Sequence, residues 1–295
     1  FEILSRKEYS QLLGARYKNN KGFEYIFVGN KIDYEQGLIA QNINKSKFKS
    51  FDIENDSRLV TYGLIEPTIN KKSKVISLYQ KSKNDKALIV GGVLEDWKIN
   101  FFGIEENVVQ NEQRFDENLL TGCLTFLDMD VKSMDISVEK STCEDALNFI
   151  RVSGHVNNIK IQNALYDGLD LDYSNLTFGD INIYNAGNDC LDLSAGNYQV
   201  HYSNLNKCHD KAVSVGEQTN SIFNYIQILN SNQGVVSKDS SVVNIKNVTF
   251  KNTDLCFSAY NKKQEFWGGK IIVDQHNCQP IRIHQQKNSL IEILQ

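Results

Sequence analysis

The sequence predicts an all-β fold in which one chain winds into a parallel β-helix with coils of about 22 residues. The first observation is a repeat, because six similar segments begin at positions 145, 167, 189, 210, 233 and 254. The second observation is an alternation of apolar and polar residues that ends on asparagine, as in Ile159–Asn163 and Ile181–Asn185. Such alternation is typical of strands, and asparagine is typical of turns.

Two other repeat architectures have to be weighed against the β-helix. Leucine-rich repeats need a sustained Leu-x-x-Leu-x-Leu-x-x-Asn frame, and helical repeats need helical periodicity; the sequence has neither. In a β-helix, equivalent residues of successive coils stack about 4.8 Å apart. We therefore expect two stacked columns of polar side chains. The first is an internal amide ladder of Asn163, Asn185, Asn206 and Asn230, and the second is a hydroxyl column of Ser214, Ser237 and Ser258.

The 295 residues are predicted to form one β-helix domain. Residues 120–275 hold the regular coils, residues 1–115 are expected to form irregular N-terminal coils and a cap, and residues 276–295 form a C-terminal coil. A cap is needed because a terminal coil leaves an open sheet edge. The net charge of −4 excludes the global basic field of a protein that wraps nucleic acid. No run approaches the roughly 18 apolar residues of a membrane-spanning helix.

Six cysteines are present: Cys123, Cys143, Cys190, Cys208, Cys256 and Cys278. None belongs to a Cys-x-x-Cys pair, and a chain of this length does not need disulfides to build a core, so the redox compartment stays open. Cys256 and Cys278 lie one coil length apart, and we expect a stacked thiol ladder there rather than a disulfide. The chain begins at Phe1 without methionine, which indicates a processed or trimmed chain.

Strand alternation sorts the repeat into columns that face inward or outward. The first inward column is expected to hold Leu147, Leu169, Leu191, Ala212, Val235 and Cys256, and the second Phe149, Leu171, Leu193, Ser214, Ser237 and Ser258. Asp170, Asp172 and Asp192 lie at outward positions, and Asp167 and Asp189 lead into the same strands. Because like charges on neighbouring strands repel, these five carboxylates need a partner. A divalent cation, a lysine or a substrate can supply it.

Aspartates at the start of the repeats recur in nearly every coil, and capping of turns explains such a residue. This series comprises Asp145, Asp167, Asp189, Asp210 and Asp254. The outward aspartates occur in two coils only, which favours a functional role. We expect catalytic residues on and beside this face, namely Asp172, Asp192, Lys211, Glu217, Lys238 and Asp239. Substrate-binding residues are expected at Arg151, Tyr260, Lys262, Lys263 and Trp267. For the lysines the alternative is a salt bridge to a neighbouring aspartate, and for the aromatic residues it is packing.

The repeat length, strand pattern and asparagine ladder of residues 120–275 resemble the right-handed parallel β-helix superfamily of pectate lyases, polysaccharide epimerases and phage tailspikes. One family of these lyases binds Ca²⁺ through a motif like Asp-Asp-x-x-Asp plus an aspartate one coil earlier, and uses a lysine on a later coil as base. The segment Asn188–Asp192 looks similar, although Asn188 replaces the first aspartate. The resemblance implies a Ca²⁺ site at Asp167, Asp170, Asp189 and Asp192, with Lys211 or Lys238 as base.

This resemblance predicts a secreted, periplasmic or cell-surface protein that acts on an acidic polysaccharide. The favoured reaction is β-elimination by a lyase on a glycan that contains uronic acids. A C5-epimerase would use nearly the same residues. A glycoside hydrolase would need paired carboxylates, for which Asp170 or Asp172 with Asp192 are candidates. The alternative from another class is a non-catalytic glycan-binding module, adhesin or tailspike. No nucleic-acid partner is expected, and the sequence does not indicate an oligomeric state.

Overall fold

The computed structural model describes residues 16–18, 24–28, 31–32, 48–105 and 120–294. The chain forms two compact units, residues 1–47 with 111–121 and residues 48–110 with 122–295. The described strands of the first unit form an antiparallel sheet of β1 (Arg16–Lys18), β2 (Glu24–Val28) and β3 (Lys31–Ile32). Most of the N-terminal coils predicted before Phe48 lie outside the described residues.

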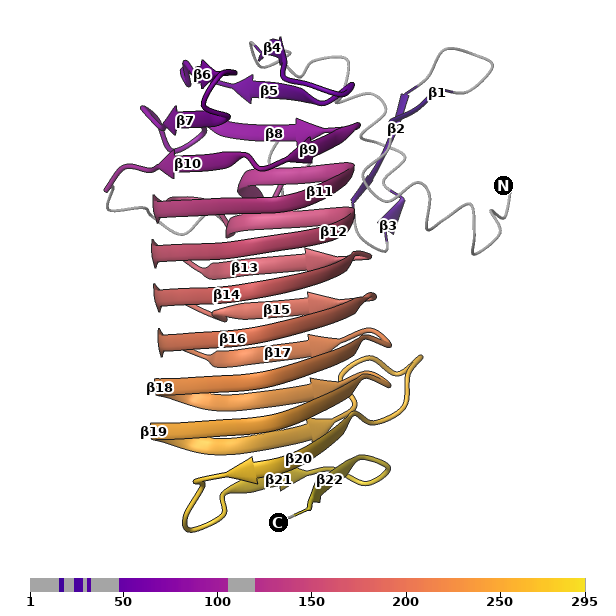
Figure 1. Cartoon of the computed structure of the whole chain (residues 1–295). Coiled ribbons are helices and arrows are strands. Elements are labelled where there is room, and N and C mark those ends of the chain that lie inside the picture. The colour runs from indigo at the N-terminus through magenta and orange to yellow at the C-terminus, as the bar shows by residue number, and fades with distance from the viewer. Residues whose placement is uncertain (1–15, 19–23, 29–30, 33–47, 106–119, 295) are drawn as a thin grey trace. The chain divides into compact units, whose positions relative to one another are not determined.

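The second unit is a parallel β-solenoid whose strands stack coil upon coil along the chain (Figure 1). Its parallel strands are β7 (Val75–Tyr79), β8 (Lys86–Val90), β9 (Val93–Glu95), β10 (Lys98–Phe102), β11 (Gly122–Ser141), β12 (Asp145–Ala164), β13 (Asp167–Asp172), β14 (Asn175–Ala186), β15 (Leu191–Ser194), β16 (Asn197–Cys208), β17 (Lys211–Gly216), β18 (Asn220–Lys238), β19 (Val242–Tyr260), β20 (Lys270–His276), β21 (Ile283–Gln285) and β22 (Leu290–Ile293). Every regular element of the described residues is a strand, which confirms the predicted all-β class.

The register of the solenoid confirms the predicted coil length. Leu147 pairs with Leu169, Leu169 with Leu191, and Leu191 in turn with Val213, so the step between paired residues stays constant. A constant step places each residue directly above its equivalent in the previous coil. Side chains of one kind therefore meet across coils, both in the core and on the surface.

Antiparallel strands close the N-terminal edge of the solenoid. β4 (Phe48–Asp52) pairs with β5 (Arg58–Tyr62), and β5 pairs antiparallel with β8. β6 (Thr68–Asn70) pairs antiparallel with β7 in the same way. Since β8 also pairs in parallel with β11, β5 covers the edge that the first coil would leave open. The predicted N-terminal cap is confirmed for the residues from Phe48 onward.

The core lies inside the coils and consists of stacked apolar side chains. Phe126 and Phe149 come from successive coils, and their parallel rings lie 4.7 Å apart between centroids. Phe178 meets Phe149 edge-on at 6.3 Å, and all three rings are fully buried. Both arrangements are favourable for aromatic pairs.

All six cysteines form disulfides: Cys123–Cys143, Cys190–Cys208 and Cys256–Cys278. The expected thiol ladder at Cys256 and Cys278 is therefore wrong. The step is longer at this point, because Phe257 pairs with Ile283, whereas the regular step would bring Gln279 to that position. The residue stacked on Cys256 therefore comes later in the chain than Cys278, so the two cysteines do not occupy equivalent positions. The two Cα atoms lie 6.4 Å apart, within the range that a disulfide bridges.

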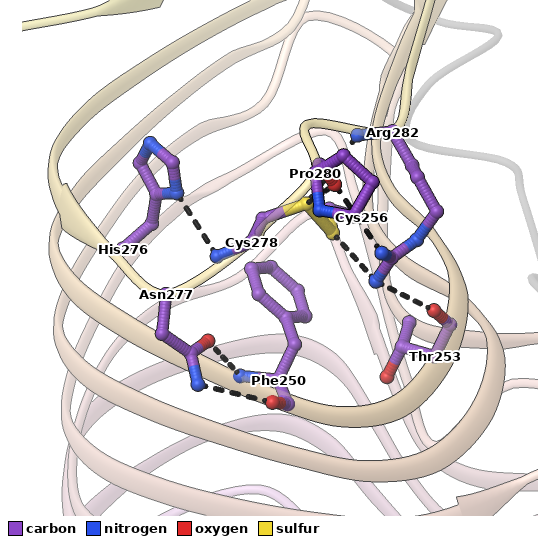
Figure 2. The surroundings of a disulfide bond; sticks show 8 residues. All are labelled: Phe250, Thr253, Cys256, His276, Asn277, Cys278, Pro280 and Arg282. Carbon is purple, nitrogen blue, oxygen red and sulfur yellow. Dashed lines mark hydrogen bonds between the residues drawn. A yellow bond between two sulfur atoms is a disulfide. The ribbon is translucent and has the colours of Figure 1, made fainter.

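Figure 2 shows how the last coil is fastened around this disulfide. The side chain of Asn277 accepts a hydrogen bond from the backbone N–H of Phe250 at 2.6 Å and donates one to its carbonyl at 3.1 Å. Arg282 donates through Nη2 to the carbonyl of Thr253 at 3.0 Å, and the same nitrogen lies 3.5 Å from Cys256 Sγ. Side chains thus replace the strand pairing that is missing where the coil changes length.

The predicted amide ladder exists in part, because Asn206 pairs with Tyr184 and Leu229 and so lies one position before the corner column of the other three asparagines. The prediction that the ladder is internal is wrong. Asn185 donates to Asn163 at 3.0 Å, and Asn230 donates to Asn206 at 2.9 Å, in both cases at an exposed corner. Asn163 and Asn185 have φ values of 60° and 64°. Asparagine tolerates this left-handed conformation better than most residues, so the corner selects it and its side chain projects outward.

After residue 210 the predicted inward columns are correct at Val235 and Ser237 and wrong at Ala212, Ser214, Cys256 and Ser258. Leu191 pairs with Val213 rather than Ala212, and Phe257 rather than Cys256 follows Val235. The cause is the alignment of Asp210 with Asp189, which assumes a coil one residue shorter than the observed one. The strands instead keep the full step, as the pairing of Leu191 with Val213 shows.

The predicted hydroxyl column is wrong for the same reason. Ser214 pairs with Asp192 and Val236, and Ser258 also pairs with Val236. Ser237 pairs with Val215 instead, so the three serines do not share one column. Ser214 and Ser258 belong to the outward column that contains Asp192.

Candidate functional site

An outward column of polar side chains runs across β12, β13, β15 and β17. Asn148 pairs with Asp170, Asp170 with Asp192, and Asp192 with Ser214. Asn148 and Asp170 are only 1% and 3% exposed, and Ser214 is fully buried. This column is the candidate site, and we call it the acidic face together with the aspartates at the start of the same strands.

The amide of Asn148 organises the first part of the acidic face. Its Nδ2 lies 3.1 Å from a carboxylate oxygen of Asp145, 3.1 Å from one of Asp170 and 3.4 Å from one of Asp172. An amide nitrogen has two hydrogens, so three acceptors share two donors. The predicted residues Asp170 and Asp172 thus lie together, held by a residue that has no acid–base function of its own.

Asp167 is held in place by donors from the next coil. Its Oδ1 accepts hydrogen bonds from Asn188 Nδ2 at 2.7 Å and from the backbone N–H of Asp189 at 2.8 Å. Burial, with the charges of Asp145 and Asp189, nevertheless raises the pKa of Asp167 to about 8. The carboxyl group of Asp167 is therefore protonated at neutral pH as long as no cation offsets the neighbouring charges.

Lys211 forms ion pairs with two carboxylates. Its Nζ lies 3.2 Å and 3.4 Å from the two oxygens of Asp189, and it also contacts Asp210 Oδ2. Burial and the charge of Asp192 raise the pKa of Asp189, against the effect of Lys211. Burial alone would lower the pKa of Lys211, but the two carboxylates outweigh it and raise that pKa. Lys211 therefore stays an ammonium group and is poorly suited to act as a base.

Lys238 has a different environment. Its Nζ donates to Ser214 Oγ at 2.8 Å and lies 3.9 Å from Asp192 Oδ1. The stem of Lys238 lies across Gly216, where a Cβ would come within 2.8 Å of Lys238 Cε. The missing side chain at Gly216 thus lets a lysine of the later coil reach back to Asp192. Lys238 is 8% exposed, so its head group is largely removed from water.

Glu217 and Asp239 lie near the ends of the following strands. Glu217 forms an ion pair with Lys263. Asp239 is fully buried, and its Oδ1 accepts the backbone N–H groups of Lys262 and Lys263 at 2.7 Å and 2.8 Å. These contacts give Asp239 a clear structural function, which is to hold the start of the loop after β19.

Of the remaining predicted binding residues, Tyr260 is the strand-pairing partner of Lys238, whereas Arg151 lies on β12, several coils away. Arg151 pairs with Asp128 through two hydrogen bonds of 2.5 Å and 3.0 Å. The ring of Tyr260 lies 6.4 Å from that of His284. Trp267 is 74% exposed, so this ring is available to a ligand.

In the part of the chain that the structure describes, one oxygen from each of Glu144, Asp145 and Asp167 lies within 4.8 Å of the other two. Of the four predicted Ca²⁺ ligands, Asp189 already has an ammonium group where a metal ion would have to lie. Crowded carboxylates and a raised pKa at Asp167 are the conditions that a divalent cation relieves. The donor set therefore fits Ca²⁺ better at this trio than at the predicted four.

Sequence reasoning misses three residues of the site. The register error assigns Ser214 to the core. The sequence places Asn148 correctly in the outward column, but an amide side chain does not by itself indicate a functional residue. Glu144 precedes the repeat motif, and only the turn before β12 brings it to Asp145 and Asp167.

We expect Asp167→Asn to change how stability depends on pH. In the unfolded chain the carboxyl group ionises near its ordinary pKa of 3.8, whereas in the folded protein it keeps its proton up to about pH 8. Across this window the folded state binds the extra proton, so the free energy of unfolding falls as pH rises. The asparagine of the variant would keep the acceptor oxygen and lose this penalty.

Thermal unfolding without added metal, measured at both ends of that pH window, checks this expectation. The variant and the wild type should unfold alike at the acidic end, and the variant should be more stable at the alkaline end. The control is Asp254→Asn, which changes an exposed aspartate of the same repeat series. Parallel pH profiles for Asp167→Asn and the wild type would contradict the raised pKa.

Comparison of the chain with protein-family models, curated proteins and solved structures gives no match. The assignment of function therefore depends on the geometry of the acidic face. Within the described residues, the structure contains no helix of the length and apolarity that crossing a membrane requires.

Proposed function

We propose that this protein is a polysaccharide lyase that cleaves a glycan containing uronic acids by β-elimination. The observation that carries the proposal is the position of Lys238. Its amine lies beside Ser214 and Asp192, on a face otherwise rich in carboxylates. Elimination next to a uronate needs a base and a cation that neutralises the substrate carboxylate. Lys238 would be the base, and the carboxylates of this face would attract the cation.

Each group has a defined part in the proposed reaction. Lys238 Nζ takes the C5 proton as the base, the electron pair of that bond forms the C4–C5 double bond, and the C4–O bond breaks. The departing oxygen needs a proton donor, and Lys211 stays an ammonium group through its pairs with Asp189 and Asp210. Ca²⁺, held by Glu144, Asp145 and Asp167, would neutralise the substrate carboxylate. A C5-epimerase would share the first step and return the proton from the other face.

A glycoside hydrolase is the second candidate, and the raised pKa of Asp167 favours it. Without a cation, Asp167 keeps its proton at neutral pH and could act as a general acid. A protonated and an ionised carboxyl group side by side are the pair that hydrolysis of a glycosidic bond needs. The two candidates therefore differ in their response to metal.

The experiment is an assay of polygalacturonate, alginate and heparosan, each with Ca²⁺ and with EDTA. A lyase produces an unsaturated product, seen as ultraviolet absorbance, and EDTA should abolish that rise. New reducing ends without absorbance would contradict the lyase and indicate the hydrolase. Thermal unfolding with and without Ca²⁺ provides a readout that does not need activity. Stabilisation by Ca²⁺ that Asp145→Asn removes would support the proposed ligands.

We also propose that the protein works in an oxidising compartment, as a secreted, periplasmic or cell-surface protein. Three disulfides support this, because the cytosol keeps thiols reduced. A polymeric substrate outside the cell requires the same location.

A further inference from the structure

A groove of about 670 Å³ lies at a corner of the solenoid, on the side where the strands of the acidic face begin. Thr142, Leu165, Gly187 and His209 line it from four successive coils, and Glu105 and Lys140 lie at one end. Since coils are spaced like adjacent strands, these four residues span about 14 Å along the solenoid axis. The groove is thus long in one direction, which suits an extended chain rather than a compact ligand.

The polar groups of the groove suit hydroxyl groups. Asn185 donates to Asn163, and none of the described residues offers a further partner for Asn163 Nδ2 or Asn185 Oδ1. One amide nitrogen and one amide oxygen therefore remain for a ligand, and sugar hydroxyl groups can accept from the first and donate to the second. The exposed imidazole of His209 adds a further polar group.

The charges of the groove do not favour an anion. Lys140 and Glu105 form an ion pair of 2.8 Å, so the two charges at this end offset each other. Phosphate or uronate groups would find no unpaired ammonium among the lining residues that the structure describes. An uncharged polymer avoids the cost of burying a charge without a partner.

An extended peptide fits less well than a glycan. A peptide that adds a strand needs a row of unpaired backbone donors. Here the backbone N–H groups of Leu165, Gly187 and His209 donate to carbonyls of the previous coil at 3.2, 3.1 and 3.1 Å. The corner therefore presents side chains and carbonyl groups rather than an open sheet edge.

We infer that this groove binds a stretch of uncharged glycan that lies parallel to the solenoid axis. The site is separate from the acidic face, although Leu165 and Gly187 each stand shortly before an aspartate of that face. The inference does not depend on turnover at the acidic face. A polymer with uncharged and uronate segments would contact both.

Native electrophoresis through gels that contain glucomannan, xyloglucan or mixed-linkage β-glucan tests the inference. The wild type should be retarded in at least one of these gels. The variant Asn185→Gly/His209→Ala removes an amide and an imidazole and should weaken binding about tenfold, as expected for two hydrogen bonds. Glycine at 185 keeps the left-handed backbone conformation.

The control is Asn252→Gly/His201→Ala. Asn252 donates to Asn230 at 2.9 Å and has a φ of 53°, so it repeats the environment of Asn185 away from the groove. The control should be retarded like the wild type. Retardation in none of the gels, or equal losses in the two variants, would overturn the inference. Lyase assays of the same variants keep it distinct from the proposed function, because neither variant alters the acidic face.

Discussion

Replacing Lys238 with methionine is expected to reduce β-elimination by about 10²–10⁴-fold, the usual contribution of a positioned acid or base. Methionine keeps most of the apolar stem that lies across Gly216 and loses the amine beside Ser214 and Asp192. The fold should survive, because the core columns beneath Lys238 are unchanged. The rate of formation of the unsaturated product, measured on the best substrate, checks the prediction.

Two further variants separate a catalytic amine from a structural one. Gly216→Ala adds a Cβ that would lie 2.8 Å from Lys238 Cε, so it displaces the stem and leaves the charge in place. We expect it to lower the rate as well, with little loss of stability, because the displaced atoms belong to a flexible side chain. Lys160→Met removes an exposed lysine and should leave the rate unchanged. Full activity of Lys238→Met would contradict the proposed base.

The coil architecture can be predicted because a solenoid repeats its constraints. Every coil needs inward apolar residues at the same positions, so the spacing of Leu147, Leu169 and Leu191 is by itself enough to indicate one column. The asparagines at 163 and 185 mark the corner in the same way. The leucine column and the asparagine corner both arise from contacts between equivalent residues of successive coils. Such contacts select the same residue type at a fixed spacing, which is visible in the sequence as a period.

The later half of the site cannot be predicted in this way because it breaks the repeat. Asp210 resembles Asp189 in the repeat, yet the strand pairing stacks the next residue, Lys211, on Asp189. The ammonium group of Lys211 therefore reaches Asp189. Lys238 reaches Asp192 by crossing Gly216, a contact between residues two coils apart that no periodic pattern contains. A register error of one residue is enough to exchange the inner and outer faces of a strand.

The disulfides escape prediction for a related reason. Cysteines one coil apart suggest stacking, but Cys123–Cys143 and Cys190–Cys208 are separated by 20 and 18 residues, fewer than a full coil. These bonds therefore join residues within a turn of the solenoid rather than equivalent positions. Even numbers of cysteines allow many pairings, and only the folded chain selects one.

Reduction of the three disulfides is expected to cause the largest loss of stability. The bonds close loops of 20, 18 and 22 residues, and loops of this length each contribute about 3 kcal/mol to the free energy of unfolding in the chain-entropy description. The total is comparable to the roughly 5–15 kcal/mol that holds a typical domain folded. Urea unfolding with and without reductant should show this loss as a large fall in the midpoint.

Single-bond variants make the prediction quantitative. Cys190→Ala/Cys208→Ala and Cys123→Ala/Cys143→Ala open loops of nearly equal length, so each should lose about 3 kcal/mol. An unchanged midpoint in reductant, with the thiols shown to be free, would contradict the expectation. If the expected loss is found, a reducing cytosol would lower the free energy of unfolding by a comparable amount. Such a loss would support the oxidising compartment that we propose for this protein.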